Sequence, residues 1–181
     1  MPLVIFTDEY SQEFIYNTRK KVQLENVTKI YNTSIETLPL FKKYDLFNDI
    51  IMQEQQGRAW NPAWNQAVKD MPETSSVEFM ILENSKSYFL SNASKENVYN
   101  TTFFAWIDAT YGKGNASLYP FNYEWDPEFP PEKISIIKVV DLAVNDRMVD
   151  DDETMLVLLI NKFPNLFNIV QGEWFNAFHL F

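Results

Sequence analysis

The stretch FFAWIDATYGKG, residues 103–114, joins an apolar run to a single carboxylate and a glycine-containing loop. The apolar residues predict a buried strand over residues 101–109, the central strand of the protein. Asp108 then falls at the carboxyl end of that strand. Two interpretations of this position are open: Asp108 caps the turn that follows, or it holds a metal ion or a nucleotide at the edge of a sheet.

Strand and helix patterns alternate on both sides of this run. The sequence predicts strands over residues 3–9, 27–33 and 134–142, and helices over residues 11–24, 38–55 and 75–94. A further helix opens at Asp151 and ends before Pro164, and a short strand follows it. This order predicts α/β layering in one domain over residues 1–181.

The first predicted helix has a serine as its expected cap, and the second and third helices each carry an apolar stripe. Ser11 is the expected N-cap of the first helix. In the second helix Phe41, Tyr44, Phe47 and Ile51 share one face, and in the third the predicted stripe is Phe79, Leu82, Lys86 and Phe89.

The composition limits the class of partner. The chain has 181 residues and a formal net charge of -10, which argues against a nucleic-acid backbone or an anionic membrane as the main partner. It has no cysteine, so disulfides and thiolate zinc sites are absent.

Signals for the cellular compartment conflict. The sequence shows no apolar run of transmembrane length, and the opening residues do not resemble a secretory signal. Five Asn-x-Ser/Thr sequons nevertheless suit a lumenal, glycosylated setting, so localisation stays open. They begin at Asn26, Asn32, Asn92, Asn100 and Asn115.

Aspartates follow two of the predicted strands. Asp8 comes after LVIFT and Asp108 after FFAWI. In open α/β sheets ligands bind outside the carboxyl ends of the strands. Ordinary turns between strands and helices carry the same residues, so the pattern alone leaves a site and a pair of caps as alternatives.

Several quoted segments together resemble the HtrL/YibB-like family, a group usually placed with nucleotide-sugar transferases of the GT-A fold. The matching segments are VIFTDE, TLPLFKKYD, NSKSYFL, FFAWIDATYG and DDETMLVLLINKFPNLFNIVQGEWF. The resemblance implies a three-layer α/β sandwich with a mainly parallel central sheet. It also implies transfer of a sugar from a nucleotide-diphosphate donor to a glycan or another hydroxyl acceptor, with manganese or magnesium.

The resemblance assigns expected roles to several residues. Asp108 takes the place of the metal-binding carboxylate, and Tyr111 in the loop after it is a donor contact. Asp8 would contact the ribose or the base, or else cap a turn. Lys86 would meet a donor phosphate as a point charge, or else be a surface lysine whose stem covers apolar residues.

The acidic run that opens the last helix also has two interpretations. Asp151, Asp152 and Glu153 complement the dipole of that helix. Alternatively Asp151, or else Asp152, is the base that activates the acceptor hydroxyl.

The sequence departs from the family pattern in three places. The usual Asp-x-Asp motif reads Asp108-Ala109-Thr110, without its second carboxylate. The family's strand and helix before VIFTDE, and its glycine- and phenylalanine-rich segment before DDE, are expected to be missing, which predicts an incomplete GT-A-like fold. The alternatives to a transferase are therefore a catalytically inactive scaffold and a glycan-binding relic.

Aromatic residues and the single histidine complete the candidates. Trp106 is expected in the core because of its strand position, and Trp174 would form a lid or an acceptor wall, although core packing explains tryptophans equally well. The resemblance allows His179 as a late metal ligand, and the alternative is that this histidine has no role in a site. No phosphate-binding glycine loop, HExxH or GxSxG motif is present.

Overall fold

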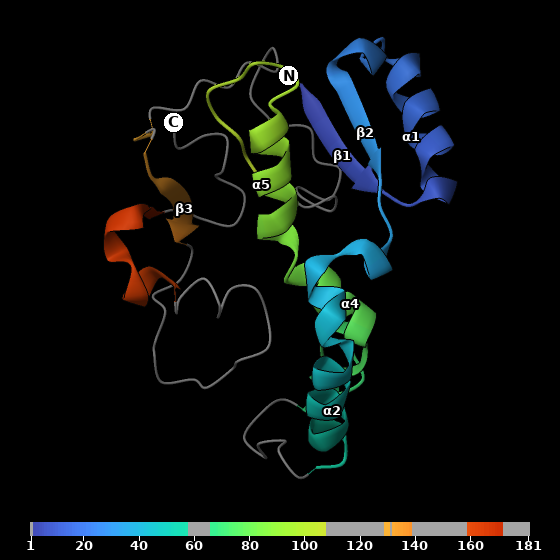
Figure 1. Ribbon diagram of the computed structural model, residues 1–181, viewed down its shortest axis with the longest axis vertical. Coiled ribbons are helices and arrows are strands. Elements are labelled where there is room, and N and C mark those ends of the chain that lie inside the picture. Colours follow the sequence, from blue (N-terminus) through green and yellow to red (C-terminus); the bar gives the residue numbers. More distant parts are fainter. Residues whose placement is uncertain (1, 58–65, 108–128, 131, 139–158, 172–181) are drawn as a thin grey trace.

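The computed structural model describes residues 2–57, 66–107, 129–130, 132–138 and 159–171. Within these ranges the chain mixes helices with short parallel strands (Figure 1). The N-terminal elements are β1 (Leu3–Thr7), α1 (Glu9–Lys21) and β2 (Thr28–Asn32).

The first two strands and α1 form a β-α-β unit. β1 and β2 pair in parallel, with Leu3 opposite Thr28 and Thr7 opposite Asn32. Parallel pairing requires a crossover, which α1 supplies while packing against β2. α5 (Lys86–Glu96) lies on the other side of this sheet, so the unit has three layers (Figure 1).

The helix α1 begins at a residue other than the expected one. Asp8, not Ser11, is the N-cap, and its carboxylate accepts the backbone N–H of Ser11 at 2.9 Å. An acidic Glu9 in the first turn and a basic last turn also complement the helix dipole. The predicted cap is therefore wrong by three positions, because a carboxylate oxygen of Asp8 accepts the unpaired N–H of Ser11 in the first turn.

The predicted helix over residues 38–55 forms in two parts. Residues Pro39–Lys43 make a 3-10 turn, and α2 (Tyr44–Gln55) follows. Its predicted face is confirmed: Ile51 is buried, and Phe41, Tyr44 and Phe47 pack against the same core.

The predicted helix over residues 75–94 is interrupted. α4 (Val77–Glu83) ends where the side chains of Asn84 and Ser85 bond to the carbonyls of Met80 and Ile81, at 2.9 and 2.7 Å. Such bonds compete with the helical ladder, and α5 starts afresh at Lys86. The predicted stripe is wrong at three of its four positions and right at Phe89, because the buried residues of this segment are Val77, Ile81, Ser85 and Phe89.

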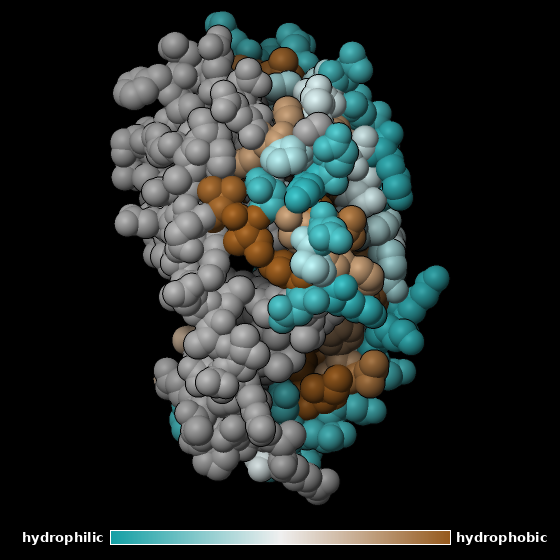
Figure 2. Space-filling model, turned by 90° about the vertical axis from the view of Figure 1, so that its left-hand side faces the viewer, coloured by the Kyte–Doolittle hydropathy of each residue, from teal (hydrophilic) through white to brown (hydrophobic). Residues whose placement is uncertain are grey.

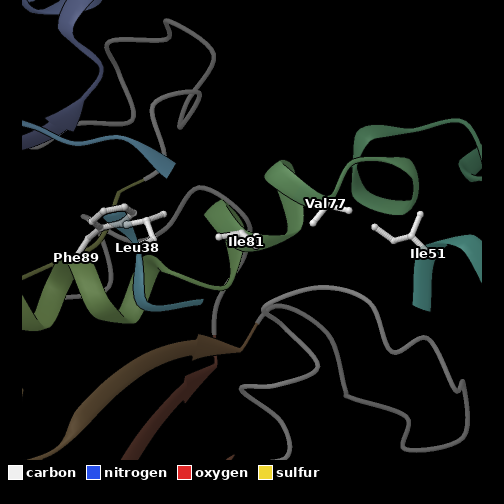
Figure 3. Packing of buried hydrophobic residues seen from close by; sticks show 5 residues of the cluster. All are labelled: Leu38, Ile51, Val77, Ile81 and Phe89. Atoms are coloured by element: carbon white, nitrogen blue, oxygen red, sulfur yellow. The ribbon is translucent and has the colours of Figure 1, made fainter. Parts of the chain in front are cut away.

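The buried core lies where α2, α4 and the start of α5 meet. In Figure 3 Leu38 and Phe89 point toward one another, Ile51 and Val77 do the same, and Ile81 lies between the two pairs. All five side chains are at most 8% exposed. Burial of such side chains is the main stabilising contribution here.

Two further strands form a separate sheet. β3 (Ile134–Lys138) pairs in parallel with β4 (Phe167–Gln171). The structure thus confirms a mixed fold with parallel strands, but among the described residues these strands make two two-stranded sheets in place of one central sheet. Residues 101–107 form no strand, so the predicted central strand is wrong over that part.

Hydrophobic side chains are not confined to the core. They are visible between hydrophilic ones on the face drawn in Figure 2. On α1, which buries no residue, Tyr10 is 94% exposed and Phe14 is 73% exposed.

Candidate functional site

A pocket of about 460 Å³ lies beside the first strand. Its walls come from β1, from α5 and from residues 97–107. Aromatic and aliphatic side chains dominate the lining, and none of its described residues carries a charge. Volume and composition are typical of sites for small molecules.

Aromatic rings connect the three walls. Phe6 of β1 lies 4.8 Å from Phe89 of α5, and Phe89 lies 6.0 Å from Trp106, with ring planes 16° apart. On its other side Phe6 stacks on Tyr31 of β2 at 5.2 Å. Offset aromatic pairs of this kind stabilise beyond the area that they bury. Phe89 is therefore the centre of the pocket wall.

Trp106 is not in the core. It is 40% exposed and lines the pocket, which corrects the prediction made from its position in an expected strand. Residues 101–107 join no sheet, and the indole of Trp106 stacks on Phe89.

The turn after α5 holds one end of the pocket wall in place. Asn97 has a left-handed backbone, with φ 40°, and its side chain makes three hydrogen bonds to Thr101, the longest from the Thr101 hydroxyl to Oδ1 at 3.4 Å. The Thr101 N–H donates to Oδ1 at 2.8 Å, and Nδ2 donates to the Thr101 carbonyl at 3.0 Å. Asn100 is also left-handed, with φ 51°. Sequence reasoning missed this turn, although two asparagines in NVYN are a turn signal.

Two of the predicted site residues, Asp8 and Lys86, lie in the described part of the chain, and each lies at the N-terminal end of a helix. Asp8 caps α1, and its two bonds from Ser11, led by the one from the hydroxyl, lower the pKa of the carboxyl below its usual value of 3.8. Lys86 begins α5 and pairs with Glu83 at 2.6 Å.

The remaining predicted site residues lie outside the described part of the chain. These are Asp108, Tyr111, Asp151 and Asp152, together with Trp174 and His179.

Hard cations prefer several oxygen ligands. No group of three or more His, Asp or Glu side chains suited to a metal occurs among the described residues. Asp8, the nearest candidate in sequence to the end of β1, uses both carboxylate oxygens for Ser11.

Of the helices that the structure describes, none combines the length and the apolar character needed to cross a bilayer.

These observations define the class of protein: an α/β protein whose parallel β-α-β unit borders an uncharged aromatic pocket. The family follows from sequence comparison. A model described as "Bacterial protein of unknown function (HtrL_YibB)" matches residues 2–144 and 140–181, and the chain belongs to this family.

Comparison with a relative and with the solved structures adds two findings. Protein HtrL of Escherichia coli (strain K12) is 23% identical to this chain, over 89% of this chain and 73% of its own length. No solved structure matches the chain.

Proposed function

We propose that the protein is a nucleotide-sugar-dependent glycosyltransferase of GT-A type, with its donor at the carboxyl end of β1. The supporting observation is the shared contact of Phe6 and Trp106 with Phe89. Two residues after Phe6 comes Asp8, and two residues after Trp106 comes Asp108. Each carboxylate thus comes two residues after a ring that contacts Phe89.

The uncharged pocket is a poor place for a diphosphate. Burying a phosphate without a cation or donors is costly. The charged part of the donor would therefore lie beyond Thr7 and Ile107, where Asp108 and Lys86 are candidates. Lys86 suits this role because it lies one helical turn before Phe89, on the side of α5 away from the chain's N-terminus (Figure 1).

Manganese or magnesium is part of this proposal. When bound, such an ion neutralises the charge of a departing diphosphate. Asp108 would hold it, with Tyr111 beside the donor, and Asp151 or Asp152 would accept the proton of the acceptor hydroxyl.

A melting experiment tests the proposal. Manganese with uridine or guanosine diphosphate should raise the melting temperature, because a ligand at about 100 times its Kd adds roughly 2.7 kcal/mol. Asp108→Ala should abolish the gain, and Asp49→Ala, an exposed carboxylate on α2, should keep it. Flat melting curves with both nucleotides would favour an inactive scaffold.

A glycan-binding protein without turnover is the second candidate. The pocket favours it, because an uncharged wall with a partly exposed Trp106 suits a neutral sugar face. In that case oligosaccharides should raise the melting temperature without metal. Trp106→Ala should remove the effect and Asp108→Ala should leave it unchanged.

A further inference from the structure

The outward face of α1 exposes two aromatic rings next to each other. α1 lies on the side of the β1–β2 sheet away from α5 (Figure 1). Residues three and four apart share a face of a helix. The exposed residues that share the outward face are Tyr10, Glu13, Phe14, Asn17, Lys20 and Lys21. Tyr10 is 94% exposed and Phe14 is 73% exposed, so the packing of α1 on β2 leaves both rings in water. Adjacent exposed apolar side chains of this kind are typical of an interface.

The charges of α1 are separated along the helix. Glu9 and Glu13 lie in its first half, and Arg19, Lys20 and Lys21 form its last turn. The helix dipole explains Glu9 and the basic last turn, but Glu13 lies beyond the first turn. In the described part of the chain no ion pair joins Glu13 or Lys20 to another residue. The two opposite charges are therefore available to a partner.

This order of charges is complementary to itself when it is reversed. Glu13 and Lys20 are seven residues apart, which is close to two helical turns, so they lie on the same face. Two copies of α1 that pack antiparallel about an axis beside Asn17 place Glu13 of each copy opposite Lys20 of the other. Phe14 lies within one turn of Asn17, so both Phe14 rings border the axis. A two-fold axis makes the two sets of contacts identical.

The overall charge of the protein also favours this surface for contact between copies. The chain has a formal net charge of -10, so most surfaces of two copies repel each other. α1 has two acidic and three basic side chains, 3 − 2 = +1. Two acidic proteins therefore meet less repulsion at α1 than their net charge implies.

We propose that α1 is the contact surface of a two-fold symmetric dimer of this chain, with the two helices antiparallel and Glu13 of one copy opposite Lys20 of the other. The interface is one helix of 13 residues, about 20 Å long. Interfaces this small form transient complexes, so we expect a Kd of about 10–100 µM. The inference does not depend on the transferase proposal, because the pocket lies between β1 and α5, on the other side of the sheet.

Sedimentation equilibrium tests the dimer. Over concentrations from about tenfold below to tenfold above the expected Kd, the wild-type chain should pass from monomer to dimer. Phe14→Ala should raise the Kd at least about tenfold, because it removes a ring from the centre of the interface. It should still fold, since this ring is exposed in the monomer.

Leu46→Ala is the matched control. Leu46 is also an exposed apolar residue, at 55%, but it lies on α2, so its removal should leave the Kd unchanged. A wild-type chain that stays monomeric at the highest concentration would overturn the proposal. A Leu46→Ala variant that weakens the dimer as much as Phe14→Ala does would place the interface elsewhere and overturn it too.

Charge reversal tests the antiparallel arrangement. Glu13→Lys and Lys20→Glu should each raise the Kd at least about tenfold, because each turns two attractive pairs into repulsive ones. An equimolar mixture of the two variants should dimerise about as well as the wild type, since both pairs then join opposite charges again. A mixture that stays monomeric would contradict the arrangement. A mixture that dimerises much more tightly than the wild type would indicate parallel helices and contradict it as well.

A cross-link decides the matter if a charge variant does not fold. The chain has no cysteine, so Asn17→Cys introduces a single thiol beside the proposed axis. Under mild oxidation it should form a disulfide-linked dimer at least about tenfold faster than Asp49→Cys, an exposed position on α2, because a disulfide needs Cα atoms within about 7 Å. Equal rates for the two variants would show that collision alone links the chains, and the proposal would fail.

Discussion

Phe89 and Trp106 face each other with ring centroids 6.0 Å apart and planes 16° from parallel. Phe89 also contacts Phe6, which stacks on Tyr31, so a continuous row of rings links β2, β1, α5 and residues 101–107. Phe89 is 3% exposed, whereas Trp106 is 40% exposed. Because Phe89 is the more deeply buried ring, we expect it to contribute more to the stability of the fold than Trp106 does.

Phe89→Ala should lower the free energy of unfolding by about 3–5 kcal/mol, because it leaves a cavity among three aromatic contacts. Urea denaturation measures this change. The control is Phe14→Ala on the exposed surface of α1, which should change stability by about 0.5 kcal/mol or less. Equal effects of the two substitutions would show that the row does not stabilise the fold.

Ser85→Ala should destabilise the protein by about 1 kcal/mol, because the Ile81 carbonyl loses the hydroxyl that donates to it at 2.7 Å. Ser85 is 1% exposed, so water cannot readily replace this bond. Ser87→Ala, at an exposed position of α5, is the control and should be nearly neutral. A fully stable Ser85→Ala would mean that another contact maintains the break between α4 and α5.

Tyr31→Phe should reduce stability by about 0.5–1 kcal/mol near neutral pH, since the bond to Glu96 is exposed. This bond raises the pKa of Tyr31 from 10.0 to about 12. A raised folded-state pKa stabilises the protein fully below pH 10 and loses that effect as the pH rises to about 12. The stability difference between wild type and Tyr31→Phe should therefore disappear over that interval. A difference that stays constant through it would contradict the assignment.

Asp8→Ala should lower the melting temperature, because α1 loses its N-cap. The bonds from Ser11 lower the pKa of Asp8 below 3.8, so its contribution is complete above that pH and falls as the pH drops through the folded-state pKa. The two melting temperatures should converge in acid. Asp8→Asn, which keeps a capping oxygen, should lie between them at neutral pH, and a melting temperature equal to that of Asp8→Ala would show that only charge matters.

Local patterns predicted the elements that depend on near neighbours. The strands β1 and β2, the face of α2 and the strand after Pro164 all occur within a few residues of their predicted positions. The interruption at Ser85 was missed, because apolar periodicity continues through it. An Asn-Ser pair able to bond back to i−4 carbonyls was the available signal.

The sequence predicted less of the candidate site than of the secondary structure. The sequence identified Asp8 as a candidate site residue, but only the structure shows that both of its carboxylate oxygens accept hydrogen bonds from Ser11. The pocket itself was not predicted, because its walls come from residues 2–6, 89–93 and 97–107, which are far apart in the chain.

The sequence by itself determined the approximate positions of β1, β2, α1 and α2, since capping and side-chain periodicity act within about one turn or one strand. It also determined family membership and the absence of cysteine chemistry. Only the tertiary structure decided that Trp106 packs on Phe89 outside a sheet, and that β1, which borders a pocket, pairs only with β2 among the described strands. Those outcomes depend on contacts between distant segments, which compete with one another for the same apolar surface and backbone hydrogen bonds.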